Sequence, residues 1–395
     1  MTGYSATGRS GELVYYRDRK RLAWAFSVAY PLPPIAAILL HAQTGNEFWF
    51  FLPMVLTFVL LPLVDAAVGE DRNNPPEEVV PQLEGDTYYR YLTYLVVPVH
   101  FAVLIVSAGW AATQSLSVWA FIVLATVTGM TSGLAINTGH ELGHKRSRFE
   151  RFLAQVALAI PGYGHFSVEH NHGHHRYVAT FEDPASARMG ESIYRFAWRE
   201  IPGAFRGAWN TEKTRLGRRG RSVWHWRNEV LQSGSISLLT YAGLVAAFGW
   251  LVLPFIVMHN LAAWWQLTSA NYIEHYGLLR ARDADGRLER CQPYHSWNSN
   301  HLVSNVALFH LQRHSDHHVH PTRRYQSLRH FPDLPTLPNG YFGCFLLAWV
   351  PWAWFRVMDP RLLELKHVRG DLSKVNIEPS ARSAIVRRYA IEADS

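Results

Sequence analysis

Four long runs without a charged side chain constrain the fold more than any other feature of the sequence. Residues 22–46, 48–64, 91–139 and 230–273 contain no Asp, Glu, Lys or Arg. A helix needs about 20 mainly apolar residues to cross a hydrocarbon layer of roughly 30 Å, so the first two runs hold one span each and the last two hold two each. We therefore expect an all-α integral membrane protein with six transmembrane helices and a histidine-rich cytoplasmic helical domain.

These runs also predict how the chain is divided. The mean hydropathy of −0.07 is what six spans and a large polar remainder should average to. We expect four parts: residues 1–144 with the N-terminal tail, spans 1 to 4 and a first histidine cluster; residues 145–229, a cytoplasmic helical region with a second cluster; residues 230–275 with spans 5 and 6; and residues 276–395, a cytoplasmic region with a third cluster. Prolines at positions 31, 33 and 34 should break the first span, and residues 341–355 are too short to cross and should lie at or dip into the interface.

Basic residues near the spans predict the orientation, because cytoplasmic flanks are rich in Lys and Arg. Such residues precede the first span and follow the fourth, whereas the turns 41–47 and 113–118 carry none: Arg17, Arg19, Lys20, Arg21, Lys145, Arg146, Arg148 and Arg151. Both termini should then be cytoplasmic. The formal charge of +7 suits anionic lipid or an acidic protein partner. No nucleic-acid motif accompanies this charge, so nucleic acid is not an expected partner.

Histidines gather at the predicted cytoplasmic ends of the spans. His140 and His144 are four residues apart in "HELGHK", so on a helix they share one face and can bind one metal ion. The other clusters repeat this spacing, and His275 should leave the membrane at the same depth as His140. The further cluster members are His170, His174, His175, His314, His317 and His318.

This collection of imidazoles predicts a metal site. One histidine on an apolar helix is commonly a hydrogen-bonded core residue, but nine neutral imidazoles near hydrocarbon would be costly without a metal. A catalytic zinc takes three protein ligands, so nine exceed one zinc site and fit two metals. Imidazole suits Zn, Cu, Fe and Ni alike. Iron is favoured because the only cysteines, Cys291 and Cys344, form no thiolate motif and because the site lies beside apolar sequence.

The first cluster also matches H-E-x-x-H, the zinc-protease signature in which Glu141 would be the general base. A protease would leave the other two clusters unexplained. A metal transporter is a further alternative, but it should carry polar residues in mid-span, and spans 2 to 6 have almost none. Both alternatives are therefore weaker than an oxygen-activating enzyme.

The clusters "HELGHK", "EHNHGHH" and "LQRHSDHHVHP" resemble the three histidine boxes of the membrane fatty acid desaturase and hydroxylase superfamily. The segment "NYIEHYGL" is similar to a signature of its alkane 1-monooxygenase branch, and further similar segments extend over nearly the whole chain. The resemblance implies a six-helix enzyme of the bacterial inner membrane. It would use two non-haem irons and O₂ to hydroxylate the terminal carbon of medium-chain n-alkanes. Electrons would come from NADH through rubredoxin reductase and rubredoxin.

Carried over to this sequence, the resemblance implies nine iron ligands: His140, His144, His170, His174, His175, His275, His314, His317 and His318. His172 stands where relatives usually have a basic residue and is left out. Four other histidines should have surface or supporting roles: His165, His301, His310 and His320. An acyl desaturase or another hydroxylase of the superfamily remains the alternative.

Polar residues next to the ligands are candidates for orienting them, since metal-bound imidazoles usually donate their other N–H to a carboxylate or carbonyl. The candidates are Glu141, Glu169, Glu274, Asp316, Asn137, Asn171, Asn271 and Asp183. A substrate without a polar handle must be held by apolar burial in a narrow channel between spans 1 to 4. Candidates for closing that channel are Trp49, Phe58, Trp110 and Ile136. For docking an acidic rubredoxin we expect Arg176, Arg323 and Arg324.

Overall fold

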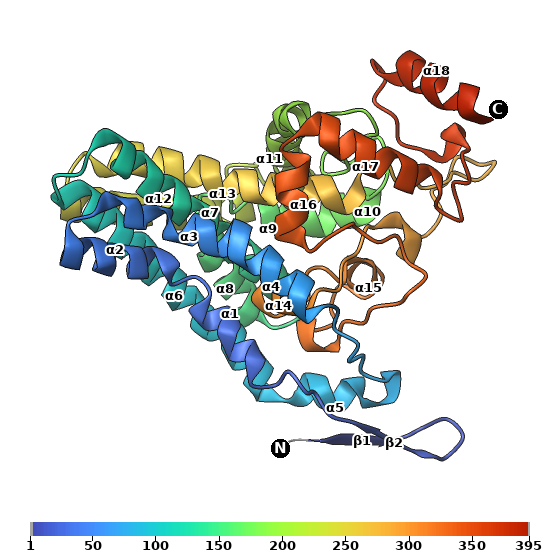
Figure 1. The fold of residues 1–395 in the computed structure, drawn as a ribbon, viewed down its shortest axis with the longest axis horizontal. Coiled ribbons are helices and arrows are strands. Elements are labelled where there is room, and N and C mark those ends of the chain that lie inside the picture. Colours follow the sequence, from blue (N-terminus) through green and yellow to red (C-terminus); the bar gives the residue numbers. More distant parts are fainter. Residues whose placement is uncertain (1–2, 394–395) are drawn as a thin grey trace.

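The computed structural model describes residues 3–393, and its helices fall into two parts (Figure 1). In one part, long helices run side by side. In the other, short helices and loops surround the histidine clusters. The long helices of the first part are α6 (Thr87–Thr113), α7 (Val118–Gly143), α12 (Glu229–Phe248) and α13 (Val252–His275).

The remaining elements are shorter, apart from the 25-residue helix Ile193–Gly217. Before α6 they are β1 (Tyr4–Thr7), β2 (Leu13–Tyr16), η1 (Ala23–Ala25), α1 (Phe26–Ala29), α2 (Pro33–Thr44), η2 (Glu47–Phe51), α3 (Leu52–Val55), η3 (Leu56–Leu60), α4 (Leu61–Val68), η4 (Glu77–Val79) and α5 (Val80–Gly85). Between α7 and α12 they are α8 (Arg148–Ala159), α9 (Phe166–Glu169), η5 (His170–His174), α10 (His175–Tyr177) and α11 (Ile193–Gly217). After α13 they are η6 (Pro293–His295), α14 (Leu302–Ala307), α15 (His314–Val319), η7 (Tyr325–Ser327), α16 (Tyr341–Ala348), α17 (Pro351–Leu363), η8 (Leu372–Lys374) and α18 (Arg382–Ala393).

The all-α membrane architecture is confirmed. Four helical stretches are long and apolar enough to cross a bilayer: Glu47–Val68, Thr87–Thr113, Val118–Gly143 and Glu229–Phe248. Two bent pairs could each add a span, so the total lies between four and six. The 24-residue helix α13 occupies the place of the expected sixth span without being one of these four. The six-span count therefore stays a prediction, and the hairpin β1–β2 is the one sheet in residues 3–393.

The bent pairs lie where the sequence places proline. The first pair, Ala23–Ala29 with Pro33–Thr44, bends by 58° at the predicted break, because Pro33 and Pro34 start a new helix. The second pair, α16 and α17, bends by 118° over the stretch expected at the interface. A bend this sharp turns the chain back on itself, so α16 faces the interior of the protein.

Close contact between α7 and α13 fixes the ends of both helices. A Cβ on Gly129 would lie 2.1 Å from the carbonyl oxygen of His259, and one on Gly133 would lie 2.6 Å from Cβ of Gln266. Only glycine permits this approach, which is typical of small-xxx-small packing in membranes. The contact brings the histidine-bearing ends of α7 and α13 together.

The expectation that spans 2 to 6 carry almost no polar residues in mid-span is wrong. His100 is buried on α6, and Nε2 of His259 on α13 lies 2.8 Å from the hydroxyl oxygen of Ser132 on α7. Nδ1 of His259 lies 2.9 Å from the side-chain oxygen of Asn260. The His259–Ser132 contact joins α7 to α13, whereas both ring nitrogens of His100 are buried without a hydrogen-bond partner in residues 3–393.

Candidate metal centre and its cavity

All nine histidines expected as ligands converge at one place, where they form two groups. Their potential ligand atoms lie within 4.8 Å of one another inside each group. We call them the five-histidine group and the four-histidine group. The five-histidine group contains His140, His144, His170, His175 and His317, and the four-histidine group contains His174, His275, His314 and His318.

The second cluster divides between the groups because its helix is not an α-helix. Residues His170–His174 form a π-helical turn, in which residues five apart lie above one another. Nε2 of His175 therefore lies 3.1 Å from Nε2 of His170, while His174 points to the other group. The expectation that His170 and His174 bind one metal from a shared α-helical face is wrong for this reason. On α15, His314 and His318 share the four-histidine group and His317 joins the other.

Most of the imidazoles favour the neutral form that metal binding requires. Burial is the main cause, and the neighbouring imidazoles add to it. These effects hold the pKa values of the following side chains well below the ordinary 6.5: His170, His175, His314, His317 and His318. His174 differs, because burial lowers its pKa but Asp183 outweighs burial and raises that pKa above the ordinary value.

The donor sets fit two transition-metal ions. Nε2 of His140 lies 2.9 Å from Nε2 of His317, and Nε2 of His314 lies 3.0 Å from that of His318. Nε2 of His144 is buried without a hydrogen-bond partner. A cation between these converging lone pairs would satisfy them. Together the nine imidazoles exceed the four ligands that one zinc ion usually takes, so two metal positions account for the set better than one.

Two contacts orient imidazoles of the four-histidine group. Nδ1 of His174 donates to Oδ2 of Asp183 at 2.9 Å, and the Ser186 hydroxyl donates to the same oxygen. Burial acts to raise the pKa of Asp183, but His174 and Ser186 outweigh it and hold the pKa below its usual value. Nδ1 of His275 donates to the carbonyl oxygen of His295 at 3.1 Å. Both contacts leave Nε2 for a metal. The sequence offered no signal for Ser186 or for a backbone carbonyl.

Glu274 approaches a ligand on the side of the metal position and does not hold its far nitrogen, because its Oε2 lies 3.4 Å from Nε2 of His314, which faces His275 and His318. Burial, with the charge of Asp183, raises the pKa of the Glu169 carboxyl to about 8. The remaining five expected orienting residues contact protein groups other than the nine imidazoles: Glu141 with Lys145 and the Tyr325 amide, Asp316 with Arg323, Asn137 with the Leu308 carbonyl, Asn171 with the Ser167 carbonyl, and Asn271 with Glu200.

The histidines left out of the ligand set do lie outside both groups. His172 is exposed and His320 is 44% exposed. The other three contact neighbouring groups: His165 the Tyr163 ring, His301 the Ser299 hydroxyl, and His310 the Asp71 carboxylate.

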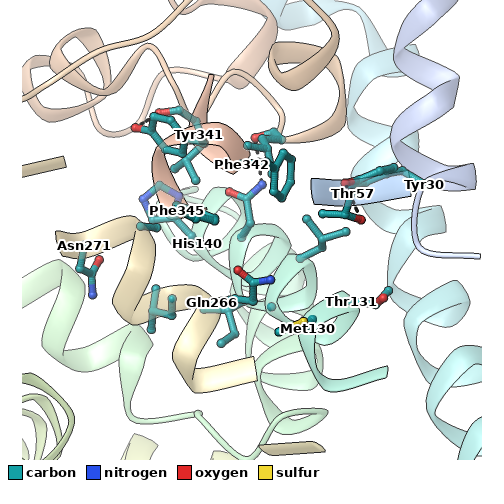
Figure 2. Close-up of a pocket in the computed structure, with 18 of the residues that line it drawn as sticks. Tyr30, Thr57, Met130, Thr131, His140, Gln266, Asn271, Tyr341, Phe342 and Phe345 are labelled. Atoms are coloured by element: carbon teal, nitrogen blue, oxygen red, sulfur yellow. Dashed lines mark hydrogen bonds between the residues drawn. The ribbon is translucent and has the colours of Figure 1, made fainter. Parts of the chain in front are cut away.

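A mainly apolar cavity lies between the membrane part and both histidine groups (Figure 2). His140, His170 and His314 are part of its lining. The rest of the lining comes from Tyr30, from α2, α3, η3, α7, α9, α13 and α16, and from the loop after α14, and it is mostly apolar. Among the expected channel residues, Phe58 and Ile136 line this cavity. Trp49 and Trp110 are not part of its lining.

One polar side chain in this wall was missed by the sequence reasoning. Gln266 is 7% exposed, and its Oε1 has no hydrogen-bond partner although it lies in an otherwise apolar region. Its position among the uncharged residues of α13 gave no sign that it would face a cavity. Thr57 and Thr131 are the further polar residues away from the histidines, and Thr57 accepts a hydrogen bond from the Tyr30 hydroxyl.

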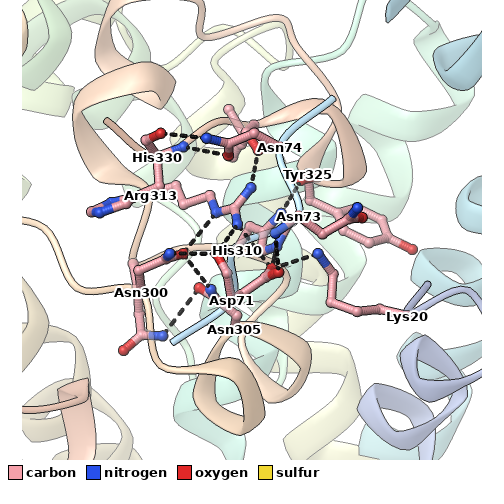
Figure 3. A network of polar contacts seen from close by, with 12 residues as sticks. Lys20, Asp71, Asn73, Asn74, Asn300, Asn305, His310, Arg313, Tyr325 and His330 are labelled. Atoms are coloured by element: carbon pink, nitrogen blue, oxygen red, sulfur yellow. Dashed lines mark hydrogen bonds and ion pairs between the residues drawn. The ribbon is translucent and has the colours of Figure 1, made fainter. Parts of the chain in front are cut away.

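A buried ionic network lies next to the start of α15 (Figure 3). Asp71 is 2% exposed and accepts hydrogen bonds from Lys20, His310 and Arg313. Arg313 is fully buried, donates also to Asn300, and directly precedes His314. The network therefore ties the N-terminal segment and the loop after α4 to the helix that carries histidines of both groups.

Two of the three arginines expected to dock an electron donor are engaged inside the protein. Arg323 is 7% exposed and pairs with Asp316 and Glu77. Arg324 pairs with Glu150. Their predicted role as free docking charges is therefore wrong, because these carboxylates already neutralise them. Arg176 is exposed.

Comparison with known proteins agrees with this geometry. A family model described as "Fatty acid desaturase" matches residues 117–348. Alkane 1-monooxygenase 1 of Alcanivorax borkumensis is 55% identical over 95% of this chain and 93% of its own length. Alkane 1-monooxygenase of Pseudomonas putida is 56% identical over 95% of this chain and 92% of its own. The xylene/toluene monooxygenase hydroxylase component XylM of Pseudomonas putida is 27% identical over 84% of this chain. The chain therefore belongs to the alkane 1-monooxygenase branch of the fatty acid desaturase family.

Proposed function

We propose that this protein is a di-iron membrane monooxygenase that converts medium-chain n-alkanes to 1-alkanols. One observation carries the proposal: the lining of a mainly apolar cavity includes His140, His170 and His314, which belong to the two different histidine groups. A chain lying in this cavity would present its end to both metal positions. The names of the relatives that match nearly the whole chain support the same reaction.

The cavity would select and position the substrate. An alkane has no polar group, so each buried CH₂ would contribute about 0.8 kcal/mol of binding free energy. The narrow wall would hold the chain lengthwise and exclude water, which favours the terminal carbon over the weaker internal C–H bonds. Phe58 and Ile136 would set the accessible length.

The nine histidines would hold the irons, with one position in each group. When bound, the two irons would supply the activation of O₂ and the attack on the C–H bond. The protein contributes neutral imidazoles and their orientation. Asp183 would keep the proton of His174 on Nδ1, and the His295 carbonyl would do the same for His275.

We further propose that electrons come from NADH through rubredoxin reductase and rubredoxin. The net charge of +7 supports an acidic docking partner. The distribution of basic residues supports placement in a bacterial inner membrane, with both termini and the histidine groups on the cytoplasmic side. Arg176 is the remaining docking candidate among the three predicted arginines.

The test is product analysis with isotope-labelled oxygen. The purified protein in lipid would be supplied with iron, NADH, rubredoxin, its reductase, a mixture of n-alkanes and ¹⁸O₂. We expect ¹⁸O-labelled primary alcohols, detected by gas chromatography and mass spectrometry. A His314→Ala variant should form none, whereas His320→Ala should match the parent because His320 lies outside both groups.

The same experiment separates the alternatives. A desaturase of this family would give an alkene or an unsaturated acyl chain and no labelled alcohol. A zinc protease would not need O₂ and would depend on Glu141, which here pairs with Lys145. Absence of labelled alcohol from protein that holds two irons would overturn the proposed function.

A further inference from the structure

Helix α11 has three faces, of which one is buried and two carry exposed side chains. Its 25 residues would be about 37 Å long. The packed face includes Phe196, Glu200, Ala204 and Ala208, all buried. Glu200 accepts hydrogen bonds from Thr268 and Asn271 of α13. This face therefore lies next to the helix that ends in His275.

A second face exposes a line of aromatic side chains. Tyr194 is 50% exposed, Trp198 85% and Phe205 47%. Their spacing of four and seven residues places them on one side of the helix. Phe205 stacks on Trp209, whose ring contacts Trp224 in the loop before α12. Exposed aromatic area of this extent is unusual for a surface in contact with water.

The third face is basic. It contains Arg195, Arg199, Arg206 and Lys213. These residues lie about 100° around the helix from the aromatic line, because each is offset from it by one residue. Arg195 pairs with Glu378 and Arg199 with Glu191. Arg206 and Lys213 are exposed and pair with no carboxylate of residues 3–393. Further exposed basic residues follow at the end of the helix, Arg218 and Arg219.

The two ends of α11 contact two of the long helices. The Tyr194 ring stacks on Trp265 of α13 at 5.5 Å, and its hydroxyl donates to the Trp349 carbonyl. At the other end, Glu212 accepts a hydrogen bond from the amide of Glu229, the first residue of α12. The helix therefore runs from the second half of α13 to the start of α12, beside the boundary between the two parts of the molecule (Figure 1).

We infer that α11 is an interfacial helix that binds the surface of the bilayer on the side of the histidine groups, through anionic phospholipid. The aromatic face meets the acyl boundary, and Arg206 and Lys213 meet the phosphates. Lipid is the occupant because the aromatic line continues to Trp224 in the loop that leads into the candidate span α12, and because adjacent aromatic and basic faces are typical of helices that bind a membrane interface. This surface is separate from the proposed reaction. Through Glu200, which bonds to Thr268 and Asn271, the same helix contacts α13, and α13 ends in His275 of the four-histidine group.

Nitroxide labels test the contact. In a parent with Cys291→Ser and Cys344→Ala, a spin label is attached at Trp198→Cys or Phe205→Cys, or at Asn210→Cys as an exposed control outside the aromatic face. In bilayers containing phosphatidylglycerol, the ratio of O₂ to nickel-chelate accessibility should be several-fold higher at 198 and 205 than at 210. Equal ratios at all three positions would overturn the inference, as would a label at 198 shielded from both reagents, which indicates a protein contact.

A second measurement tests the anionic lipid itself. The preference of the metal-loaded protein for spin-labelled phosphatidylglycerol over phosphatidylcholine should fall about fivefold for each cation removed in Arg206→Gln and Lys213→Gln. The matched control is Arg287→Gln with Lys366→Gln, two exposed cations outside α11. An unchanged preference in the α11 variant, or an equal loss in the control, would contradict the inference. Metal content of each variant reports that the fold is retained.

Discussion

The two histidine groups lie side by side but differ in their surroundings. In the four-histidine group, His174 pairs with Asp183 and His314 lies beside Glu274. In the five-histidine group, no imidazole pairs with a carboxylate of residues 3–393. One group therefore combines four imidazoles with two nearby acidic groups, while the other offers five imidazoles without a paired carboxylate in that range.

The two candidate metal positions are therefore not equivalent. A divalent cation is attracted by nearby carboxylates, and a carboxylate on the far side of a histidine increases the basicity of that ligand. We expect the four-histidine group to depend strongly on each member and on Asp183. We expect the five-histidine group to tolerate the loss of one imidazole better, because four remain.

The largest effect should come from removing a ligand. His318→Ala leaves three imidazoles in its group, and we expect about one metal ion per chain to be lost together with all measurable alcohol formation. His144→Ala leaves four in the other group and should retain more metal. Metal content by mass spectrometry, measured beside alcohol formation, checks both. Equal metal loss in the two variants would show that the groups are equivalent.

The next largest effect should be a loss of stability that removes metal from both groups. Asp71→Asn leaves Arg313 and Lys20 buried without their anion, which costs about 3–5 kcal/mol of unfolding free energy. Because α15 carries histidines of both groups, metal should be lost from both. Asp333→Asn, which breaks an exposed pair with Lys366, should cost less than about 1 kcal/mol. Denaturant unfolding in detergent gives the comparison.

The pH dependence of the same network has a definite sign. Burial acts to raise the pKa of Asp71, but His310 and Arg313 outweigh it and hold the pKa below the ordinary value of 3.8. A depressed carboxyl pKa gives stability that is present above the unfolded value and is lost as the pH falls below it. Parent protein should therefore lose stability below about pH 4. The Asp71→Asn variant should lack this component, and identical acid profiles would contradict the assignment.

A smaller effect should fall on one group only. Asp183→Asn removes the carboxylate behind His174, and changes of this kind reduce metal affinity by about 10–100-fold. The control is Glu141→Gln, because Glu141 contacts Lys145 and the Tyr325 amide instead of a ligand. Chelator titration measures both affinities. A larger loss of metal affinity in Glu141→Gln would mean that a carboxylate orients the five-histidine group instead.

The smallest effect should leave both metals in place. Phe58→Ala enlarges the cavity, and each additional CH₂ accommodated should improve kcat/KM for a longer alkane by about fourfold. Trp49→Ala lies outside the lining and should leave the preference unchanged. Competition between alkanes of different length reads the result, and the metal content of both variants should equal that of the parent. A shift in Trp49→Ala alone would place the chain-length limit elsewhere.

Much of the fold could be predicted because its physical signals are local. Uncharged runs of span length, basic flanks and the prolines at the α1–α2 break act within a few residues. The count of spans could not be fixed in the same way, because α13 carries buried polar residues such as His259 and Gln266 whose partners come from other helices or a cavity.

For the candidate site, residue identity was easier to predict than grouping. The spacing of the histidines predicted eight of the nine side chains that converge, and the position of His275 at the end of the expected sixth span predicted the ninth. Their division into two groups depends on the π-helical turn at His170–His174, which spacing does not reveal. The partners of the ligands depend on contacts between distant segments. Asp183 could be named from its sequence position near His174, whereas the carbonyl of His295 and the supporting role of Asp71 required the folded chain.

Mössbauer spectroscopy of ⁵⁷Fe-loaded protein would test most directly that the chain provides two unequal metal positions. We predict two irons per chain and two quadrupole doublets of equal area, one of which disappears in His318→Ala. A single iron per chain, or one doublet that declines uniformly in that variant, would contradict the assignment of one metal to each histidine group.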